Sequence, residues 1–178
     1  MDSSRRRAQG HAEMSAADVL RIIHRLQETG APVWIAGGWA IDALVATQTR
    51  KHNDVDIAFD AKYEERIIEK CTGLGFAIED DARPTRFVLR HTDGREIDMH
   101  PVVFDATGAG RQLVPEGEPF IYPNDCFTTG TINSQVVPCL AAEQLLRFHE
   151  GYTPLEKDRH NMQMLHEYLH IPLPEPYT

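Results

Sequence analysis

The feature that most restricts the fold is a short apolar run, followed by paired glycines and then by two aspartates that alternate with apolar residues. The run at 33–36 predicts a buried strand, and Gly37 and Gly38 predict a turn into a helix over 39–46. Residues 54–59 read as a second strand, because carboxylate and apolar side chains alternate over 54–57 and two apolar residues follow. This order predicts a part of the chain in which strands and helices are mixed.

The alternation places Asp54 and Asp56 on one face of the expected strand, because residues i and i+2 point the same way, roughly 6.6 Å apart. Two carboxylates this close resist ionising together. A divalent cation removes the repulsion, and oxygen ligands of this kind suit Mg²⁺. The alternative is a pair of solvent-facing acidic residues on an amphipathic sheet.

A predicted hairpin supplies a third carboxylate. Residues 85–91 and 96–104 read as strands joined by an Asp-Gly turn at 93–94. Asp98 and His100 share one face of the second strand. If that strand lies beside the first acidic strand, about 4.8 Å away, three carboxylates can meet. Such a set can hold metal ions for in-line displacement at phosphorus.

The glycine turn and the basic loop after the helix can be interpreted together. Gly37 and Gly38 leave backbone N–H groups free at a helix N-terminus, where a phosphate can approach closely. Arg50, Lys51 and His52 come just before the acidic strand and could neutralise a triphosphate. The alternative is an ordinary turn followed by a solvated basic loop.

Two further polar residues are candidates for contact with a substrate. His100 could orient the acceptor or act as a base, because its unperturbed pKa is near neutrality. It could equally do no more than hydrogen-bond a neighbour. Asp42 follows the glycine turn closely and could orient the site or a substrate.

Bulk properties exclude several classes of protein. A net charge of −9 argues against a broad nucleic-acid surface. The chain has 3 cysteines and no CxxC, which supports neither a disulfide framework nor a thiolate zinc site. No apolar run approaches the roughly 20 residues of a membrane span, and none follows the basic N-terminus to form a signal peptide. We therefore expect a cytoplasmic protein with no membrane or nucleic-acid partner.

The chain divides into three expected parts. Residues 1–13 are polar and predict a flexible tail or an upstream extension. Residues 14–137 hold the mixed strands and helices, and 138–178 form a small helical subdomain. The fold class is therefore α+β, a mixed sheet flanked by helices.

Four segments of the second half have weaker patterns. Residues 105–125 contain several glycines and prolines and are expected to form a loop. Residues 131–137 read as one strand. Residues 141–150 and 156–169 read as helices.

Three motifs carry a family resemblance: residues 37–42 (GGWAID), 50–56 (RKHNDVD) and 97–101 (IDMHP). They resemble the nucleotidyltransferase superfamily that includes DNA polymerase β, and within it the antibiotic nucleotidyltransferases. Further segments are similar to the small lincosamide nucleotidyltransferases, namely residues 115–117, 124–125, 138–139 and 148–152. The resemblance runs from about residue 14 to residue 165.

The resemblance implies a nucleotidyltransferase fold and the transfer of AMP from ATP, or from another nucleoside triphosphate, to a sugar hydroxyl of a lincosamide such as lincomycin or clindamycin. Pyrophosphate leaves, and Mg²⁺ is required. Asp54 and Asp56 correspond to the metal-binding pair. Asp98 corresponds to the third carboxylate, which is a metal ligand, the general base or both. Gly37 and Gly38 correspond to the turn that contacts phosphate.

Two positions depart from the family pattern. Ala36 stands where some lincosamide enzymes have Asp, and Asn161 stands where related enzymes often have a second Asp after Lys157. Lys157 either reaches a phosphate or lies on the surface. Relatives suggest a homodimer. An aminoglycoside nucleotidyltransferase is the alternative enzyme, and a nucleotide-binding, antitoxin-like module is the alternative of another class.

Overall fold

The computed structural model describes residues 12–178. Most of the flexible tail predicted over 1–13 lies outside the described residues. The described end of that segment is bonded to the rest of the chain. The N–H of Ala12 donates to the carbonyl oxygen of Asp93 at 3.1 Å. The N–H of Met14 donates to the carbonyl oxygen of His52 at 2.7 Å. The Met14 side chain is fully buried in the core.

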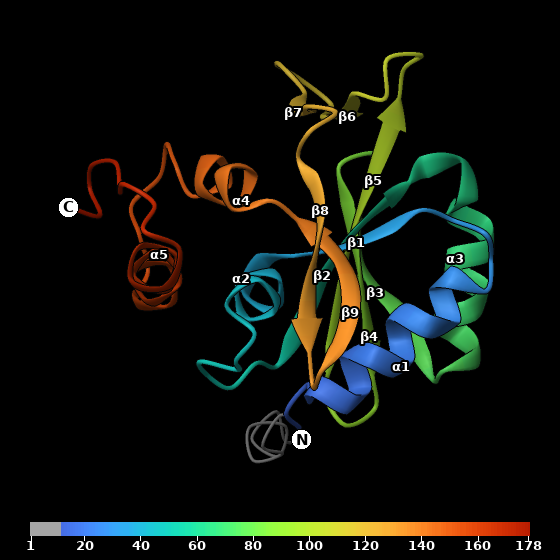
Figure 1. Cartoon of the computed structure of the whole chain (residues 1–178). Helices are drawn as coiled ribbons and strands as arrows, with labels where there is room; N and C mark the ends of the chain where they lie inside the picture. The colour runs from blue at the N-terminus through green and yellow to red at the C-terminus, as the bar shows by residue number, and fades with distance from the viewer. Residues whose placement is uncertain (1–11) are drawn as a thin grey trace, which may run out of the picture.

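Within the described residues, nine strands form a mixed sheet whose main path runs β3-β4-β5-β2-β1-β9-β8, with β6 and β7 attached beyond β5 (Figure 1). The central strand β2 lies parallel to β5 and antiparallel to β1, and β1 lies parallel to β9. The strands are β1 (Val33–Ala36), β2 (Asp54–Asp60), β3 (Phe76–Ala82), β4 (Arg86–His91), β5 (Glu96–Phe104), β6 (Gly110–Gln112), β7 (Phe120–Tyr122), β8 (Phe127–Ile132) and β9 (Gln135–Leu140).

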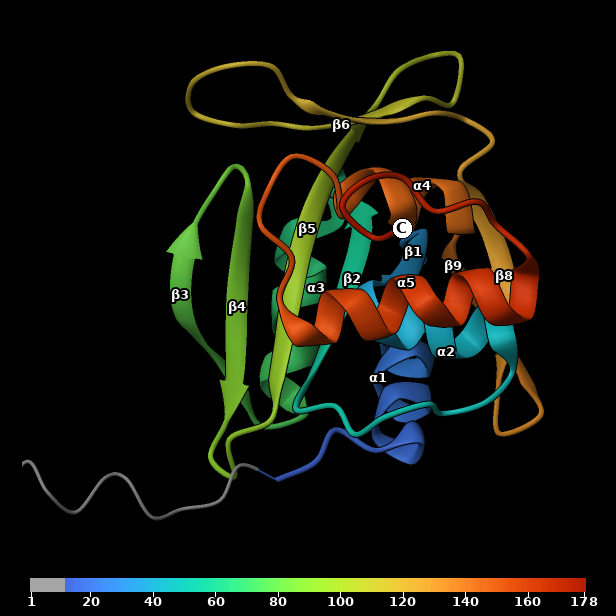
Figure 2. The same ribbon diagram turned by 90° about the vertical axis from the view of Figure 1, so that its left-hand side faces the viewer.

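Helices cover both faces of this sheet, which confirms the α+β class. Figure 1 shows α1 and α3 on one face and α2, α4 and α5 on the other. In the view of Figure 2, α5 crosses in front of α2, and the two helices are in contact. The helices are α1 (Ala16–Gln27), α2 (Gly37–Val45), a 3₁₀ turn (Ala61–Tyr63), α3 (Glu64–Gly73), α4 (Ala142–Phe148) and α5 (Glu156–Leu169).

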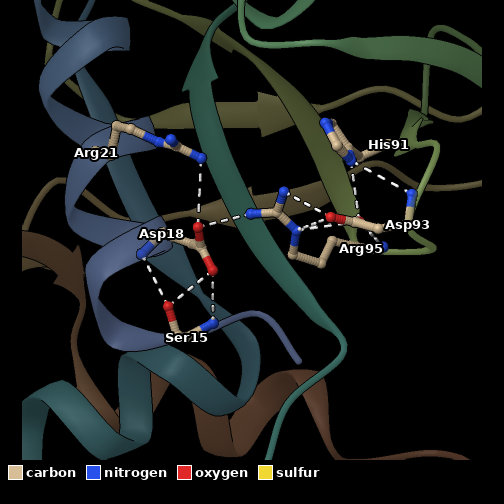
Figure 3. Close-up of polar contacts among 6 residues, drawn as sticks. All are labelled: Ser15, Asp18, Arg21, His91, Asp93 and Arg95. Atoms are coloured by element: carbon tan, nitrogen blue, oxygen red, sulfur yellow. Dashed lines mark hydrogen bonds and ion pairs between the residues drawn. The ribbon is translucent and has the colours of Figure 1, made fainter. Parts of the chain in front are cut away.

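A network of charged side chains joins α1 to the β4–β5 hairpin. Asp18 accepts hydrogen bonds from the N–H and hydroxyl of Ser15, which caps the helix. Figure 3 shows Arg95 reaching the same carboxylate, with Nη1 2.6 Å from Oδ1 of Asp18. Arg95 also pairs with Asp93 in the hairpin turn at 2.8 Å. This network fixes the end of the hairpin whose second strand carries Asp98.

The strand expected at 131–137 is wrong in extent, because the segment contains a hairpin. β8 and β9 pair antiparallel from Phe127↔Leu140 to Ile132↔Gln135. Asn133 and Ser134 form the turn between them, with φ of 47° and 63°. A two-residue turn with positive φ at both positions matches the right-handed twist of a hairpin. The turn lacks the glycine that usually marks such a hairpin, and the glycine of this segment, Gly130, lies within β8.

Two other segments also differ from the expectation. Residues 105–125 are not loop throughout, because β6 and β7 pair within them and β6 pairs with the end of β5. β3 was not expected at all. Its residues after Phe76 are exposed and include three consecutive acids at 79–81, a composition that protects a sheet edge from pairing with another chain.

The boundary expected between residues 137 and 138 falls inside β9. The helices that follow, α4 and α5, pack against α2. The division into a catalytic domain and a helical subdomain stays a prediction. None of the helices described for residues 12–178 has the length and apolar character that crossing a membrane requires.

Candidate active site

The glycine turn begins α2 directly after β1. Gly37 has a φ of 57°, a region that glycine adopts without strain. A Cβ atom at Gly37 would lie 2.1 Å from Oδ2 of Asp56, so the backbone here touches the carboxylate. Ala36 at the N-cap offers no side-chain hydrogen bond to the helix. The first N–H groups of α2 are therefore not used by a capping side chain, and they can bind an anion.

Arg50 lies over this helix start. A Cβ atom at Gly38 would lie 2.4 Å from Nη2 of Arg50, so a side chain there would push the guanidinium aside. The Nε of Arg50 donates to Oδ1 of Asn161 on α5 at 3.3 Å. The helix N-terminus and a held guanidinium together form a site suited to a phosphate group.

The parallel pairing of β2 with β5 brings the predicted carboxylates together. Asp56 is in register with Asp98, and both side chains are on the same face. His100 lies beside them, with Nε2 3.2 Å from Oδ1 of Asp56 and 3.8 Å from Oδ1 of Asp98. Asp54 precedes Asp56 by two residues on β2 and lines the same cavity.

The carboxylates differ in how readily they lose their protons. Burial and the charge of Asp56 raise the pKa of Asp54. Burial, together with Asp56, also raises the pKa of Asp98 above its ordinary value, although His100 and Arg86 oppose the shift. Burial would raise the pKa of Asp56 as well, but the hydrogen bond and the charge of His100 lower it. The group thus carries negative charge whose mutual repulsion a cation would relieve.

The donor set fits a divalent cation. Ligand atoms of Asp56, Asp98 and His100 lie within 4.8 Å of one another. Oδ1 of Asp98 is buried and has no hydrogen-bond partner among residues 12–178, an arrangement that costs free energy unless a cation or a donor completes it. Asp54 adds a fourth donor at the cavity wall. These residues could hold the divalent metal ion that nucleotidyltransferases generally use.

A cavity of about 400 Å³ opens over this group. Part of its lining comes from the glycine turn, Arg50 and the start of α5, including Lys157 and Asn161. Another part is mostly apolar and comes from β7 and α4. These apolar lining residues are Phe120, Tyr122, Leu145 and Phe148. The cavity therefore brings acidic, cationic and apolar side chains together.

Two predicted site residues do not face this cavity. Asp42 is 2% exposed, and its oxygens are bonded to His52 and Thr49, so we withdraw its assignment to the substrate. The Lys51 side chain is 86% exposed and lies 4.0 Å from Glu13, outside the cavity lining. Its assignment to the nucleotide is likewise withdrawn.

Three residues that line the cavity were missed or given little weight in the sequence. Arg86 donates to Oδ2 of Asp98 at 2.8 Å. Gln112 approaches His100 from a segment expected to be loop. Lys157, for which a surface position was left open, lines the cavity near Asp54 and Asp56 and favours their ionised forms. Of these three, Lys157 alone had a sequence signal, its match to the lysine in the C-terminal helix pattern of related enzymes.

Comparison with known proteins agrees with the family resemblance of the sequence motifs. The family described as aminoglycoside-2''-adenylyltransferase matches residues 18–165. A lincosamide resistance protein of Staphylococcus haemolyticus is 32% identical over 148 residues, which is 83% of this chain and 92% of that protein. A 2''-aminoglycoside nucleotidyltransferase of Klebsiella pneumoniae is 49% identical over 61 residues, only 34% of each chain.

Among solved structures, the lincomycin-bound lincosamide antibiotic adenylyltransferase LnuA matches with a TM-score of 0.80 and 30% identity. The match covers 86% of this chain and 98% of that one, which confirms the nucleotidyltransferase fold. The sequence similarity, the fold and the arrangement of the carboxylates all indicate the same family. The chain belongs to the aminoglycoside-2''-adenylyltransferase family and is a nucleotidyltransferase enzyme.

Proposed function

We propose that this enzyme transfers AMP from ATP to a hydroxyl group on the sugar of a lincosamide antibiotic and so confers resistance. The observation that carries the proposal is the β2–β5 register, which sets Asp56 opposite Asp98 and under the Gly37 turn. The similarity to a lincosamide resistance protein over 83% of the chain supports the acceptor class.

One set of residues binds the nucleotide, and another set would bind the cation. The N–H groups at Gly37 and Gly38 bind the triphosphate, and Arg50 neutralises its charge. Asp54, Asp56 and Asp98 would hold Mg²⁺. When bound, Mg²⁺ supplies positive charge that stabilises the attacking and leaving oxygens of an in-line displacement.

Asp98 is our candidate for the general base. Burial raises its pKa, which favours acceptance of a proton, and none of the described residues hydrogen-bonds its Oδ1. In the proposed step, Asp98 takes the proton of the acceptor hydroxyl. That oxygen forms a bond to the α-phosphorus of ATP while the bond from the α-phosphorus to the pyrophosphate oxygen breaks. The products are the adenylylated antibiotic and pyrophosphate.

The apolar side chains in the cavity lining favour a lincosamide over an aminoglycoside. A lincosamide carries alkyl groups and one basic amine, whereas an aminoglycoside carries several ammonium groups. Phe120, Leu145 and Phe148 can bury alkyl groups, and they offer no charge to an ammonium. The carboxylate of Asp158, which also lines the cavity, accepts the N–H of Leu155 at 2.8 Å and is committed to the start of α5.

The test is mass spectrometry of lincomycin, clindamycin, kanamycin and gentamicin, each incubated with the enzyme, ATP and Mg²⁺. We expect lincomycin and clindamycin to gain one adenylyl group, and Asp56→Ala to abolish the product. A product with kanamycin or gentamicin alone would replace the proposal by aminoglycoside adenylylation, which the local identity of 49% favours. ATP turnover in Asp56→Ala equal to the wild type would refute the assigned centre.

Three further properties belong to the proposal. We place the enzyme in the cytoplasm, where ATP is available, and we expect a homodimer that binds antibiotic and nucleotide but no nucleic acid. The net charge of −9 supports the last point. Cell fractionation, sedimentation and a filter-binding assay with DNA and RNA test these properties in turn.

A further inference from the structure

Two consecutive residues of α5 contact two consecutive residues of the loop that joins α2 to β2. Oδ1 of Asn161 accepts a hydrogen bond from Nε of Arg50 at 3.3 Å. Nε2 of His160 lies 2.9 Å from Oγ1 of Thr49. Each pair joins residues that are 111 positions apart in the sequence. In Figure 2, α5 crosses in front of α2, and the two contacts attach it to the loop that follows α2.

Neighbouring groups fix the direction of both hydrogen bonds. The Nε–H of Arg50 can only donate, so the oxygen of the Asn161 amide must face it. The hydroxyl of Thr49 donates its single proton to Oδ1 of Asp42 at 2.7 Å. Its oxygen is therefore left to accept from the Nε2–H of His160. Because Asp42 is buried, this contact anchors α5 to the core through Thr49.

The guanidinium of Arg50 keeps donors for a ligand. It has five N–H groups, of which Nε donates to Asn161 and one on Nη1 donates to the carbonyl oxygen of Lys51 at 3.1 Å. Both acceptors are uncharged, so they orient the guanidinium without neutralising it. Nη2 faces the first turn of α2, where a Cβ atom at Gly38 would lie 2.4 Å from it. The N–H groups of Nη2 therefore face the place where a phosphate would bind.

A long side chain in a loop needs such partners to be ready for a ligand. Fixing an arginine side chain costs conformational entropy, and a hydrogen bond that fixes it beforehand removes this cost from ligand binding. Asn161 can serve as a firm partner, because it is 5% exposed and lies beside the fully buried Met162 on the packed face of α5.

We propose that Asn161 and His160 are positioning residues that hold Arg50 over the N-terminus of α2, so that the phosphate site is complete only when α5 is docked. This inference rests on the proposed function, because it concerns the nucleotide triphosphate of the same cavity. Lys157, one turn before Asn161, also lines that cavity. The helix α5 therefore supplies one cation of the cavity and positions another.

The first test measures nucleotide binding without antibiotic. The probe is α,β-methylene-ATP with Mg²⁺, which cannot be cleaved at the α-phosphorus, and calorimetric titration of the full-length protein gives its Kd. We expect Asn161→Ala to raise Kd about fivefold and His160→Leu about threefold, on the order of what one hydrogen bond contributes. His160→Gln, whose amide N–H can replace the Nε2–H, should restore most of the affinity lost in His160→Leu.

A control for the loss of an amide lies on the same helix. Gln163 is exposed and donates to Glu167 within α5, so Gln163→Ala should keep the wild-type Kd. A wild-type Kd in folded Asn161→Ala would overturn the inference. That result would leave the mass-spectrometric test of antibiotic adenylylation unaffected, so the two proposals can fail separately.

The second test separates positioning from a merely structural role. In an Arg50→Ala background, Asn161 has no guanidinium to hold, so adding Asn161→Ala should change Kd no further. A loss of affinity that came from general disruption of α5, or from movement of Lys157, would persist in that background and would contradict the proposal. Steady-state kinetics gives a second readout: Asn161→Ala should raise KM for ATP and leave kcat at saturating ATP within about twofold of the wild type.

Discussion

Asp42 and His52 form a buried pair behind the glycine turn, with Nε2 of His52 2.6 Å from Oδ2 of Asp42 and each residue 2% exposed. The other oxygen of Asp42 accepts hydrogen bonds from the N–H and hydroxyl of Thr49. The His52 ring also stacks on Trp39 at 4.6 Å. Asp42 thus holds both ends of the short loop that carries Arg50, and its role is to place that loop.

Replacing Asp42 with Ala should reduce both stability and nucleotide binding. Removing one partner of a buried, hydrogen-bonded pair costs about 3 kcal/mol of unfolding free energy, which urea titration would measure. Because the loop positions Arg50, we expect KM for ATP to rise in the fraction that remains folded. Asp42→Asn should lose less stability than Asp42→Ala, because its amide oxygen still accepts on one side while its NH₂ group meets a donor on the other. Wild-type stability in Asp42→Ala would show that the pair is dispensable.

Gly37→Ala tests the contact between the turn and Asp56. The added Cβ atom would lie 2.1 Å from the carboxylate, so Asp56 must move. We expect at least a hundredfold loss of kcat/KM, a figure on the order of what misplacing a reacting group by about 1 Å costs. Gly30→Ala is the control: Gly30 has a similar positive φ of 79° but nothing within 4 Å of the added Cβ atom. Gly30→Ala should lose about 1 kcal/mol of stability and keep its activity.

Arg50 and Lys51 are adjacent and equally charged, but only Arg50 lines the cavity. Arg50→Gln should raise KM for ATP about tenfold, because a charge-assisted contact to phosphate contributes roughly 1.4 kcal/mol or more. Lys51→Gln, whose side chain is 86% exposed, should leave KM for ATP unchanged. Steady-state kinetics at fixed antibiotic concentration measures both. Equal effects in the two variants would mean that the loop acts only through its overall charge.

The sequence was sufficient to predict the acidic centre because a strand repeats every two residues. Asp54, Asp56 and Asp98 share a face once their strands are identified, and only the adjacency of β2 and β5 had to be supposed. The glycine turn was predictable for a similar local reason. The Gly-Gly pair directly follows the apolar run of β1, and this local pattern indicates a turn. A side chain at position 37 would collide with Asp56.

Features that depend on distant parts of the chain were not predictable. Asp42 looked like a site residue because it follows the turn, yet its carboxylate points to His52, ten residues later. Gln112 joins the site only because β6 pairs with the end of β5, which no local pattern indicates. Lys157 reaches the cavity because α5 packs across α2. Each case depends on tertiary packing, which periodicity does not encode.

Divalent cations should stabilise the protein through the acidic centre. The pKa values of Asp54 and Asp98 are raised by burial and by the charge of Asp56, so the uncomplexed carboxylates oppose one another. We expect Mg²⁺ to raise Tm in thermal unfolding, because a ligand that binds only the folded state adds stability in proportion to its affinity and concentration. EDTA should reverse the shift. Asp98→Asn should abolish it, whereas Asp105→Asn, a substitution in an exposed turn, should retain it.

Asp18 should make stability depend on pH. Burial raises its pKa, but hydrogen bonds from Ser15 and the charges of Arg95 and Arg21 outweigh burial and lower it. A lowered folded-state pKa adds stability above the unfolded value of about 3.9, which is lost as pH falls through the folded-state pKa. Asp18→Asn should therefore unfold more easily at pH 7, by about 1 kcal/mol, and the difference should vanish in acid. Exposed Glu69→Gln is the control; a pH-independent deficit in Asp18→Asn would contradict the ionic origin.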